Sequence, residues 1–251
     1  MPLLDHLIEL RTRLIWSMAA FVIAFAVCYY FSKNIYTFLA QPLADILQEK
    51  TGQERRMIFT ALTEAFFTYL KVAMFGAAFI SFPITVTQLW LFVAPGLYRS
   101  EKRALLPFLM ATPVLFVLGA SLAYYVIFPM AWRFFLSFEI PSEAGQMPIQ
   151  LEAKVSEYLG LVMKLIFAFG IAFELPVGLT LLAKVGIISS AGLKKYRRYS
   201  YVGMFIVAAV LTPPDVISQL GLAIPLIGLY EISVLMAKWV EPKPVEEDGD
   251  A

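Results

Sequence analysis

Long apolar runs separated by shorter polar stretches dominate the chain. Six runs occupy residues 14–31, 66–91, 104–128, 156–183, 199–211 and 216–236. A helix of about 20 apolar residues crosses the ~30 Å hydrocarbon core of a bilayer. The fifth run has only 13 residues, and Gln219 and Glu231 leave the sixth reliably apolar only over 220–230. The pattern predicts an all-α polytopic membrane protein with six transmembrane helices, of which the fifth and sixth are short.

The composition agrees with this class. Of the 251 residues, 60% are hydrophobic and 16% are charged, a balance that argues against a soluble protein. We expect a single membrane domain over residues 1–239. Residues 240–251 are rich in Asp and Glu, and we expect this acidic tail to be disordered.

The distribution of Lys and Arg predicts the orientation of the spans. With the N-terminus inside, the cytoplasmic segments carry 12 of these residues and the external segments carry 6. Positive charge accumulates in cytoplasmic loops, so we expect both termini in the cytoplasm. Lys71 and Lys164 lie within runs near their external ends, where snorkelling to the headgroups is the simplest explanation.

A cleavable signal peptide is the alternative interpretation of the first run. Ala24-Phe25-Ala26 resembles a cleavage site. Two acids, Asp5 and Glu9, precede the run, and its apolar character continues to Phe31. These features favour a retained span.

Several enzyme and transporter classes fit the sequence poorly. Cys28 and His6 are the single cysteine and histidine, which excludes an intrachain disulfide and any site that needs two histidines. An intramembrane protease is a poor match, because this sequence has neither a Ser–His pair nor paired aspartates within its apolar runs. A secondary transporter using Glu174 and Lys164 would predict related halves, and no internal repeat is evident. No cofactor is indicated.

A polar island lies between the second and third runs. It begins at Phe92, turns at Pro95-Gly96, and ends in a charged stretch that includes Glu101 and Arg103. Proline and glycine favour a turn, and the basic residues place it in the cytoplasm. Glu9 lies on the same side, before the first run.

Four segments in this order carry a family resemblance. They are His6-Leu-Ile-Glu-Leu-Arg11, residues 92–103, residues 169–176 and residues 211–219. Together they resemble TatC, the multispanning receptor subunit of the twin-arginine protein translocase, and the similarity extends from Pro2 to Trp239. One departure is Leu62, where the family has a proline, and this leaves the shape of that external loop open.

The resemblance implies six helices that form a curved, concave wall with no enzymatic activity. It implies the cytoplasmic (inner) membrane of a bacterium, a multimeric complex and small single-span partners of the TatA and TatB types. Folded cargo would arrive with a twin-arginine signal peptide, and the proton-motive force would drive export. No nucleic acid is expected among the partners.

The resemblance also implies a signal-peptide site on the cytoplasmic side. Its residues would be Glu9, Arg11, Phe92, Pro95, Leu97, Glu101 and Arg103. A carboxylate accepts the planar fork of a guanidinium in a bidentate manner, and each such charge-assisted bond contributes ~1.5–3 kcal/mol. A Lys-Lys peptide cannot form the fork. The alternative role for Glu101 is an ion pair with Arg99 or Arg103.

Glu174 lies inside the fourth run, where a lipid-facing charge costs ~2.5–3.5 kcal/mol. Pro176 lacks an amide hydrogen and should kink the helix there, and we expect a polar groove at this depth. The family resemblance implies docking of a partner subunit at Glu174. The alternative is a carboxyl that only holds helices together.

Other positions leave their roles open. Glu231 fits helix pairing as well as partner contact. Four further residues match family positions, although their chemistry suggests no mechanism: Pro42, Tyr124, Asp215 and Gln219. A tight external turn is enough to explain Asp215.

Overall fold

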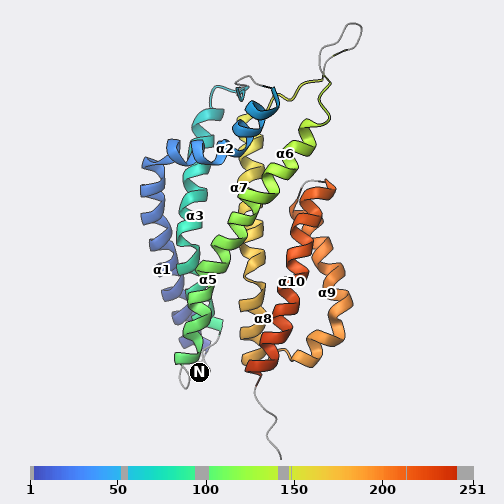
Figure 1. The fold of residues 1–251 in the computed structure, drawn as a ribbon. Coiled ribbons are helices and arrows are strands. Elements are labelled where there is room, and N and C mark those ends of the chain that lie inside the picture. Colours follow the sequence, from blue (N-terminus) through green and yellow to red (C-terminus); the bar gives the residue numbers. More distant parts are fainter. Residues whose placement is uncertain are drawn as a thin grey trace, which may run out of the picture.

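A computed structural model describes residues 3–51, 56–93, 102–140, 147, 149–212 and 214–241. These residues form helices, connections and two isolated β-bridges (Figure 1). The predicted all-α class is confirmed. The predictions for Pro95, Leu97 and Glu101, and for the tail beyond Glu241, lie outside the described residues.

The helices follow the apolar runs, with several longer than the runs themselves. Their bounds are α1 Leu3–Tyr30, α2 Ser32–Thr51, α3 Glu64–Val93, α5 Lys102–Leu122, the π-helix η1 Ala123–Ile127, α6 Phe128–Leu136, α7 Val155–Phe173, α8 Leu175–Lys184, α9 Ser190–Leu211 and α10 Val216–Val240. Within the described ranges, five helical stretches are long and apolar enough to cross a membrane. They are His6–Tyr30, Glu64–Phe92, Pro107–Leu136, Val155–Lys184 and Val216–Val240.

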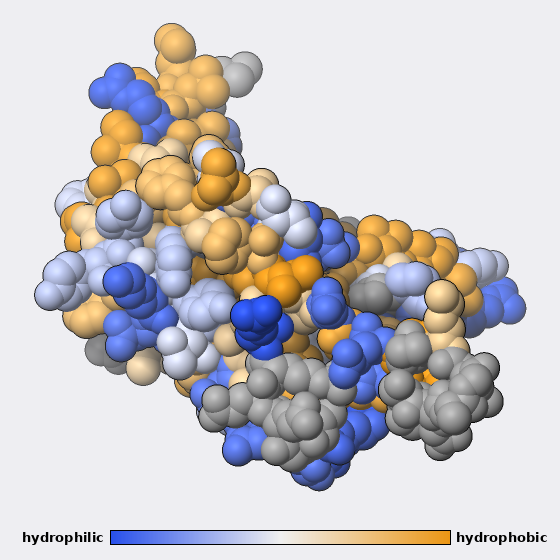
Figure 2. All heavy atoms as spheres, turned by 90° about the horizontal axis from the view of Figure 1, so that it is seen from above, coloured by the Kyte–Doolittle hydropathy of each residue, from blue (hydrophilic) through white to orange (hydrophobic). Residues whose placement is uncertain are grey.

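The spans run between two ends of the molecule (Figure 1). The start of α1, the end of α3, the start of α5 and the end of α10 share one end, called here the N-terminal end. At the opposite end, called the α2 end, α2 packs against α3 and α6. Viewed from the α2 end, hydrophilic side chains gather over the middle, apolar ones lie on the flanks, and the outline is bent rather than round (Figure 2). A curved wall fits this outline better than a closed bundle.

Two stretches between the apolar runs are partly helical. The sequence indicates a polar stretch over residues 33–65, yet α2 fills most of it and buries an apolar stripe that includes Leu39, Leu43 and Ile46. The sequence predicts a basic loop over residues 184–198, and this prediction is wrong because α9 already begins at Ser190. The Ser189 hydroxyl caps that start, because it accepts from the Gly192 amide at 3.0 Å.

The predicted shortness of the fifth and sixth spans needs a correction. The helices α9 and α10 have 22 and 25 residues, because the helical pattern continues through charged residues at the N-terminal end. Their hairpin nevertheless stops well below the α2 end (Figure 1). The third span is also longer than expected, since Pro129 lies in the first turn of α6 and the helix continues to Leu136.

Close helix crossings hold the centre of the molecule together. A Cβ atom on Gly119 of α5 would overlap the carbonyl oxygen of Phe169 on α7. A Cβ atom on Gly170 would lie 2.5 Å from the Phe116 ring. Small residues allow helix backbones to approach one another in membranes, so these glycines set the spacing of α5 and α7.

The fourth span breaks at Glu174, as the sequence predicts. The α7 helix ends at Phe173, and α8 begins at Leu175 with Pro176 in its first turn. The amide of Glu174 turns back to the carbonyls of Ile171 and Ala172. The Ala172 carbonyl, which Pro176 cannot reach with an amide hydrogen, thus has a local donor.

Candidate functional site

A cluster of aromatic and charged side chains joins α1 and α3 at the N-terminal end. The rings of His6 and Phe92 stack with their centroids 4.3 Å apart. The Arg13 guanidinium donates to Glu9 Oε1 at 3.2 Å and to Gln88 Oε1 at 3.0 Å. One arginine therefore bridges the two helices, and Glu9 and Phe92, expected to act together, lie in the same cluster.

Glu9 keeps part of its capacity to accept hydrogen bonds. Its side chain is 27% exposed, and Arg13 contacts only Oε1. A carboxylate offers about four acceptor positions on two oxygens, and no described residue donates to Oε2. A second guanidinium therefore has an acceptor available at Glu9.

The remaining residues of the expected peptide site are less well connected. Arg11 is exposed on α1, two residues from Glu9 and thus on a different face of the helix. Arg103 lies in the first turn of α5 at the N-terminal end. The structure thus brings Glu9, Phe92 and the backbone of Arg103 to one end, and Arg11 faces away from Glu9.

Glu174 is partly buried at the break between α7 and α8. Both carboxylate oxygens are buried, and neither has a hydrogen-bond partner among the described residues. The Thr112 side chain lies beside the carboxyl, but its hydroxyl donates to the Phe108 carbonyl at 3.2 Å. Apolar side chains, including Val177 and Leu181, are buried nearby on α8. The surroundings are therefore more apolar than the expected polar groove.

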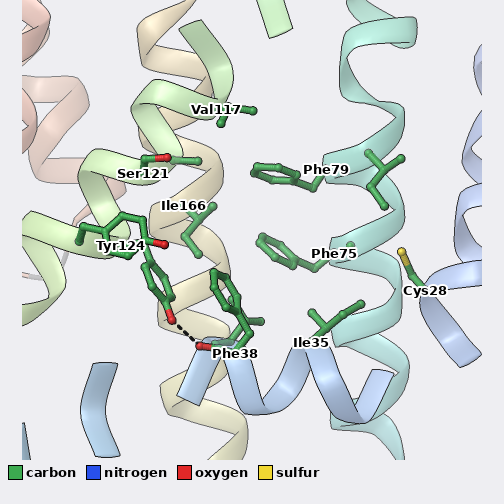
Figure 3. Close-up of a pocket in the computed structure, with 14 residues that line it drawn as sticks. Cys28, Ile35, Phe38, Phe75, Phe79, Val117, Ser121, Tyr124 and Ile166 are labelled. Atoms are coloured by element: carbon green, nitrogen blue, oxygen red, sulfur yellow. Dashed lines mark hydrogen bonds between the residues drawn. The ribbon is translucent and has the colours of Figure 1, made fainter. Parts of the chain in front are cut away.

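Pro42 and Tyr124 act on the same backbone group. Pro42 lies inside α2 and has no amide hydrogen, which leaves the carbonyl four residues earlier, that of Phe38, without its helical donor. The Tyr124 hydroxyl donates to this carbonyl at 2.7 Å, and the two rings stack with centroids 4.4 Å apart (Figure 3). The pair fastens α2 to η1 beside an apolar cavity of about 330 Å³.

Asp215 has a structural role at the tip of the last hairpin. It is the N-cap of α10, and its Oδ1 accepts from the Ser218 amide at 2.7 Å. The amide of Gln219 donates to the Asp215 carbonyl at 3.2 Å. The cap explains why an acidic residue suits this turn.

Glu231 pairs helices. Its Oε2 accepts from Arg197 at 2.7 Å and its Oε1 from the Tyr201 hydroxyl at 2.5 Å, both on α9. Of the two alternatives left open by the sequence, the structure therefore favours helix pairing. The described residues contain no group of three or more His, Cys, Asp or Glu arranged to hold a metal ion.

Sequence reasoning missed several residues of the cluster at the N-terminal end. Nothing in the sequence singles out Gln88, and a basic residue before the first run, such as Arg13, is explained by orientation alone. The spacing of His6, Glu9 and Arg13 at i, i+3 and i+7 places them on one helix face, which was a usable signal. The choice of Gln88 as partner depends on how α1 and α3 rotate against each other.

Comparisons with known proteins agree closely with one another. The family model described as "Sec-independent protein translocase protein (TatC)" matches residues 5–225. A TatC protein of Magnetococcus marinus is 50% identical over 248 residues, which cover 99% of this chain and 88% of the relative. A TatC protein of Rickettsia prowazekii is 47% identical over 237 residues, covering 94% of this chain and 92% of the relative.

Solved structures extend the similarity to three dimensions. A crystal structure of the "Twin Arginine Translocase Receptor- TatC" superposes with a TM-score of 0.76 at 37% sequence identity. The match covers 94% of this chain and 99% of the crystallised chain. A second crystal structure of a TatC protein, in the detergent DDM, gives a TM-score of 0.77.

Proposed function

The chain belongs to the TatC family of Sec-independent protein translocase proteins, and from this premise we propose that it binds twin-arginine signal peptides at its N-terminal end. It is a membrane-embedded component of a protein translocase and not an enzyme. In the proposed orientation, the N-terminal end faces the cytoplasm and the α2 end faces outward across a bacterial inner membrane. The excess of Lys and Arg in the segments at the N-terminal end supports this orientation.

The observation that carries the proposal is the partly exposed Glu9 carboxylate in the cluster that includes Phe92. Arg13 and Gln88 hold the carboxylate in place and leave Oε2 free of described donors. One guanidinium of the peptide would bind there, and Glu101, in the adjoining segment, would receive the other. Arg11, Pro95, Leu97 and Arg103 would complete the site. Two planar forks against two carboxylates explain a preference for Arg-Arg over Lys-Lys.

A direct binding experiment tests this proposal. A synthetic Arg-Arg signal peptide is titrated against the full chain in lipid nanodiscs, together with a Lys-Lys version. Glu101→Gln should weaken binding about 10- to 150-fold, the equivalent of one lost charge-assisted bond. Glu9→Gln should weaken it less, because Arg13 already occupies part of that carboxylate.

Glu49→Gln is the matched control. Glu49 lies on α2 at the opposite end, where it pairs with Arg133 at 3.0 Å, so its loss should leave peptide affinity unchanged. Equal affinity for the Arg-Arg peptide in the Glu9→Gln, Glu101→Gln double variant and the unmodified chain would contradict the proposal. Equal affinity of the unmodified chain for both peptides would also contradict it.

We propose in addition that Glu174 docks single-span partner subunits of the TatA and TatB types. The support is a buried carboxyl with both oxygens unpartnered among the described residues. An unsatisfied polar group inside a membrane is costly, and a polar side chain on a partner's span would supply the missing hydrogen bond. Glu174→Ala should therefore reduce co-purification of these partners, and Glu174→Gln should retain part of it.

Thr180→Val provides the comparison for this second test. Thr180 lies on α8, and its buried hydroxyl also lacks a partner among the described residues, so the variant removes a similar group at another position. Partner recovery should stay unchanged in Thr180→Val. Equal recovery with Glu174→Ala and Glu174→Gln would show that hydrogen bonding at residue 174 does not hold the partner.

A further inference from the structure

The α9 helix is the least firmly attached of the long helices. It packs mainly against α10 and touches α7 at few places. An apolar groove of about 570 Å³ lies between α7 and α9, and α8 and α10 also contribute to its lining. The width of this groove depends on what holds α9 in position.

One end of α9 is tied to α10. At the N-terminal end, the Ser190 hydroxyl donates to Glu241 at 2.6 Å. Further along, Arg197 and Tyr201 contact Glu231. These bonds fix the first half of α9 against α10, and they do not bind α9 to α7.

The other end of α9 terminates in an unsatisfied carbonyl. The last backbone bond of the helix runs from the Thr212 amide to the Ala208 carbonyl at 2.9 Å. The helix ends at Leu211 and Thr212 is extended, so the Val210 carbonyl is one of the last carbonyls of α9 that have no helical donor. In a hydrocarbon environment such a group needs a donor from the protein.

Lys164 of α7 supplies that donor. Its Nζ donates to the Val210 carbonyl at 3.3 Å. The carbonyl end of a helix carries partial negative charge, which favours a cation there. Lys164 also shares a face of α7 with the groove residues Ala168, Ile171 and Ala172, four, seven and eight positions later. It therefore lies at the end of the groove nearer the α2 end.

We infer that Lys164 is a latch that holds the tip of α9 against α7 and sets the width of the groove between them. Snorkelling of Lys164 to the headgroups makes the opposite prediction, because a snorkelling side chain would leave α9 unattached. The latch is a property of the unliganded chain and is independent of which peptide or partner the protein binds.

Distance measurements between α7 and α9 distinguish the latch from snorkelling of Lys164. In the full chain with Cys28→Ala, spin labels are placed on cysteines introduced at Gly160 and Ile206, both exposed, and double electron–electron resonance is recorded in lipid nanodiscs. Lys164→Met should broaden the distribution and lengthen its mean by about 2 Å or more, the scale of helix shifts at interfaces. Lys164→Arg, which can still donate to the carbonyl, should restore the original distribution.

Two controls keep the result specific. Lys71→Met removes another exposed span lysine, and it should leave the α7–α9 distance unchanged. A second label pair at Val22 of α1 and Ile84 of α3, both exposed, should be unaffected by Lys164→Met. An unchanged α7–α9 distribution in Lys164→Met would overturn the inference, as would failure of Lys164→Arg to restore it or an equal change at the α1–α3 pair.

Discussion

The contact between Tyr124 and the carbonyl of Phe38 should depend energetically on Pro42. Tyr124→Phe removes the hydroxyl that donates at 2.7 Å and keeps the ring stacked on Phe38. In the natural sequence the Phe38 carbonyl then has no donor, because residue 42 is a proline. In a Pro42→Ala background, the amide of residue 42 replaces the lost hydroxyl.

The size of the effect follows from the cost of leaving a partly buried carbonyl without a donor. That cost is about 1–3 kcal/mol in proteins generally, and side-chain hydrogen bonds in membrane proteins average ≈ 0.6 kcal/mol with a maximum of ≈ 1.7. Tyr124 is 9% exposed, so we expect Tyr124→Phe to cost about 1–1.7 kcal/mol. In Pro42→Ala the same substitution should cost about 1 kcal/mol less, which is the coupling energy.

A double-mutant cycle in mixed detergent micelles measures this coupling through the free energy of unfolding. Pro42→Ala alone should stabilise α2, since proline is about 3 kcal/mol less favourable than alanine inside a helix, and the cycle subtracts this gain. Tyr125→Phe is the matched control, because Tyr125 is 67% exposed and its hydroxyl has no described partner. The same cost of Tyr124→Phe in both backgrounds would refute the reasoning.

Three further predictions concern stability. Asp215→Ala should destabilise the start of α10 by about 0.5–2 kcal/mol and Asp215→Asn by much less, as read from thermal unfolding; equal losses would argue against the cap. Gly119→Ala should cost about 1–3 kcal/mol by overpacking, whereas Gly160→Ala, with no atom within 4 Å, should be neutral or stabilising, and equal unfolding midpoints would contradict the close crossing. Glu231→Gln should cost up to ~1 kcal/mol at low salt and less at high salt, because its pair with Arg197 is partly exposed; a salt-independent loss in denaturant titrations would exclude an ionic contribution.

Hydrophobic periodicity was enough to predict the class and the positions of the spans. It failed where charge and helix coincide. The start of α9 carries Lys194, Lys195, Arg197 and Arg198, and a charged stretch beside a span resembles a loop until the Ser189 cap is recognised. The same limit applies to α2, where Pro42 and scattered polar residues masked a helix with a buried apolar face.

The candidate site shows which contacts a sequence can specify. Glu9 and Arg13 are four residues apart on one helix, so their pairing is readable from spacing alone. The bond from Arg13 to Gln88 joins residues 75 positions apart, and it depends on the packing of α1 against α3. Likewise, the burial of Glu174 follows from its place within a span, but the apolar character of its surroundings follows from which side chains α5 and α8 contribute.

Backbone carbonyls that lack a helical donor connect these observations. Pro42 exposes the carbonyl of Phe38, which Tyr124 satisfies from η1. The end of α9 leaves that of Val210 without a helical donor, and Lys164 satisfies it from α7. In water such carbonyls could bond to solvent, but in a bilayer the donor must come from the protein. A carbonyl without a helical donor therefore takes one locally, as Ala172 does from the Glu174 amide, or from another helix, as Phe38 and Val210 do from Tyr124 and Lys164.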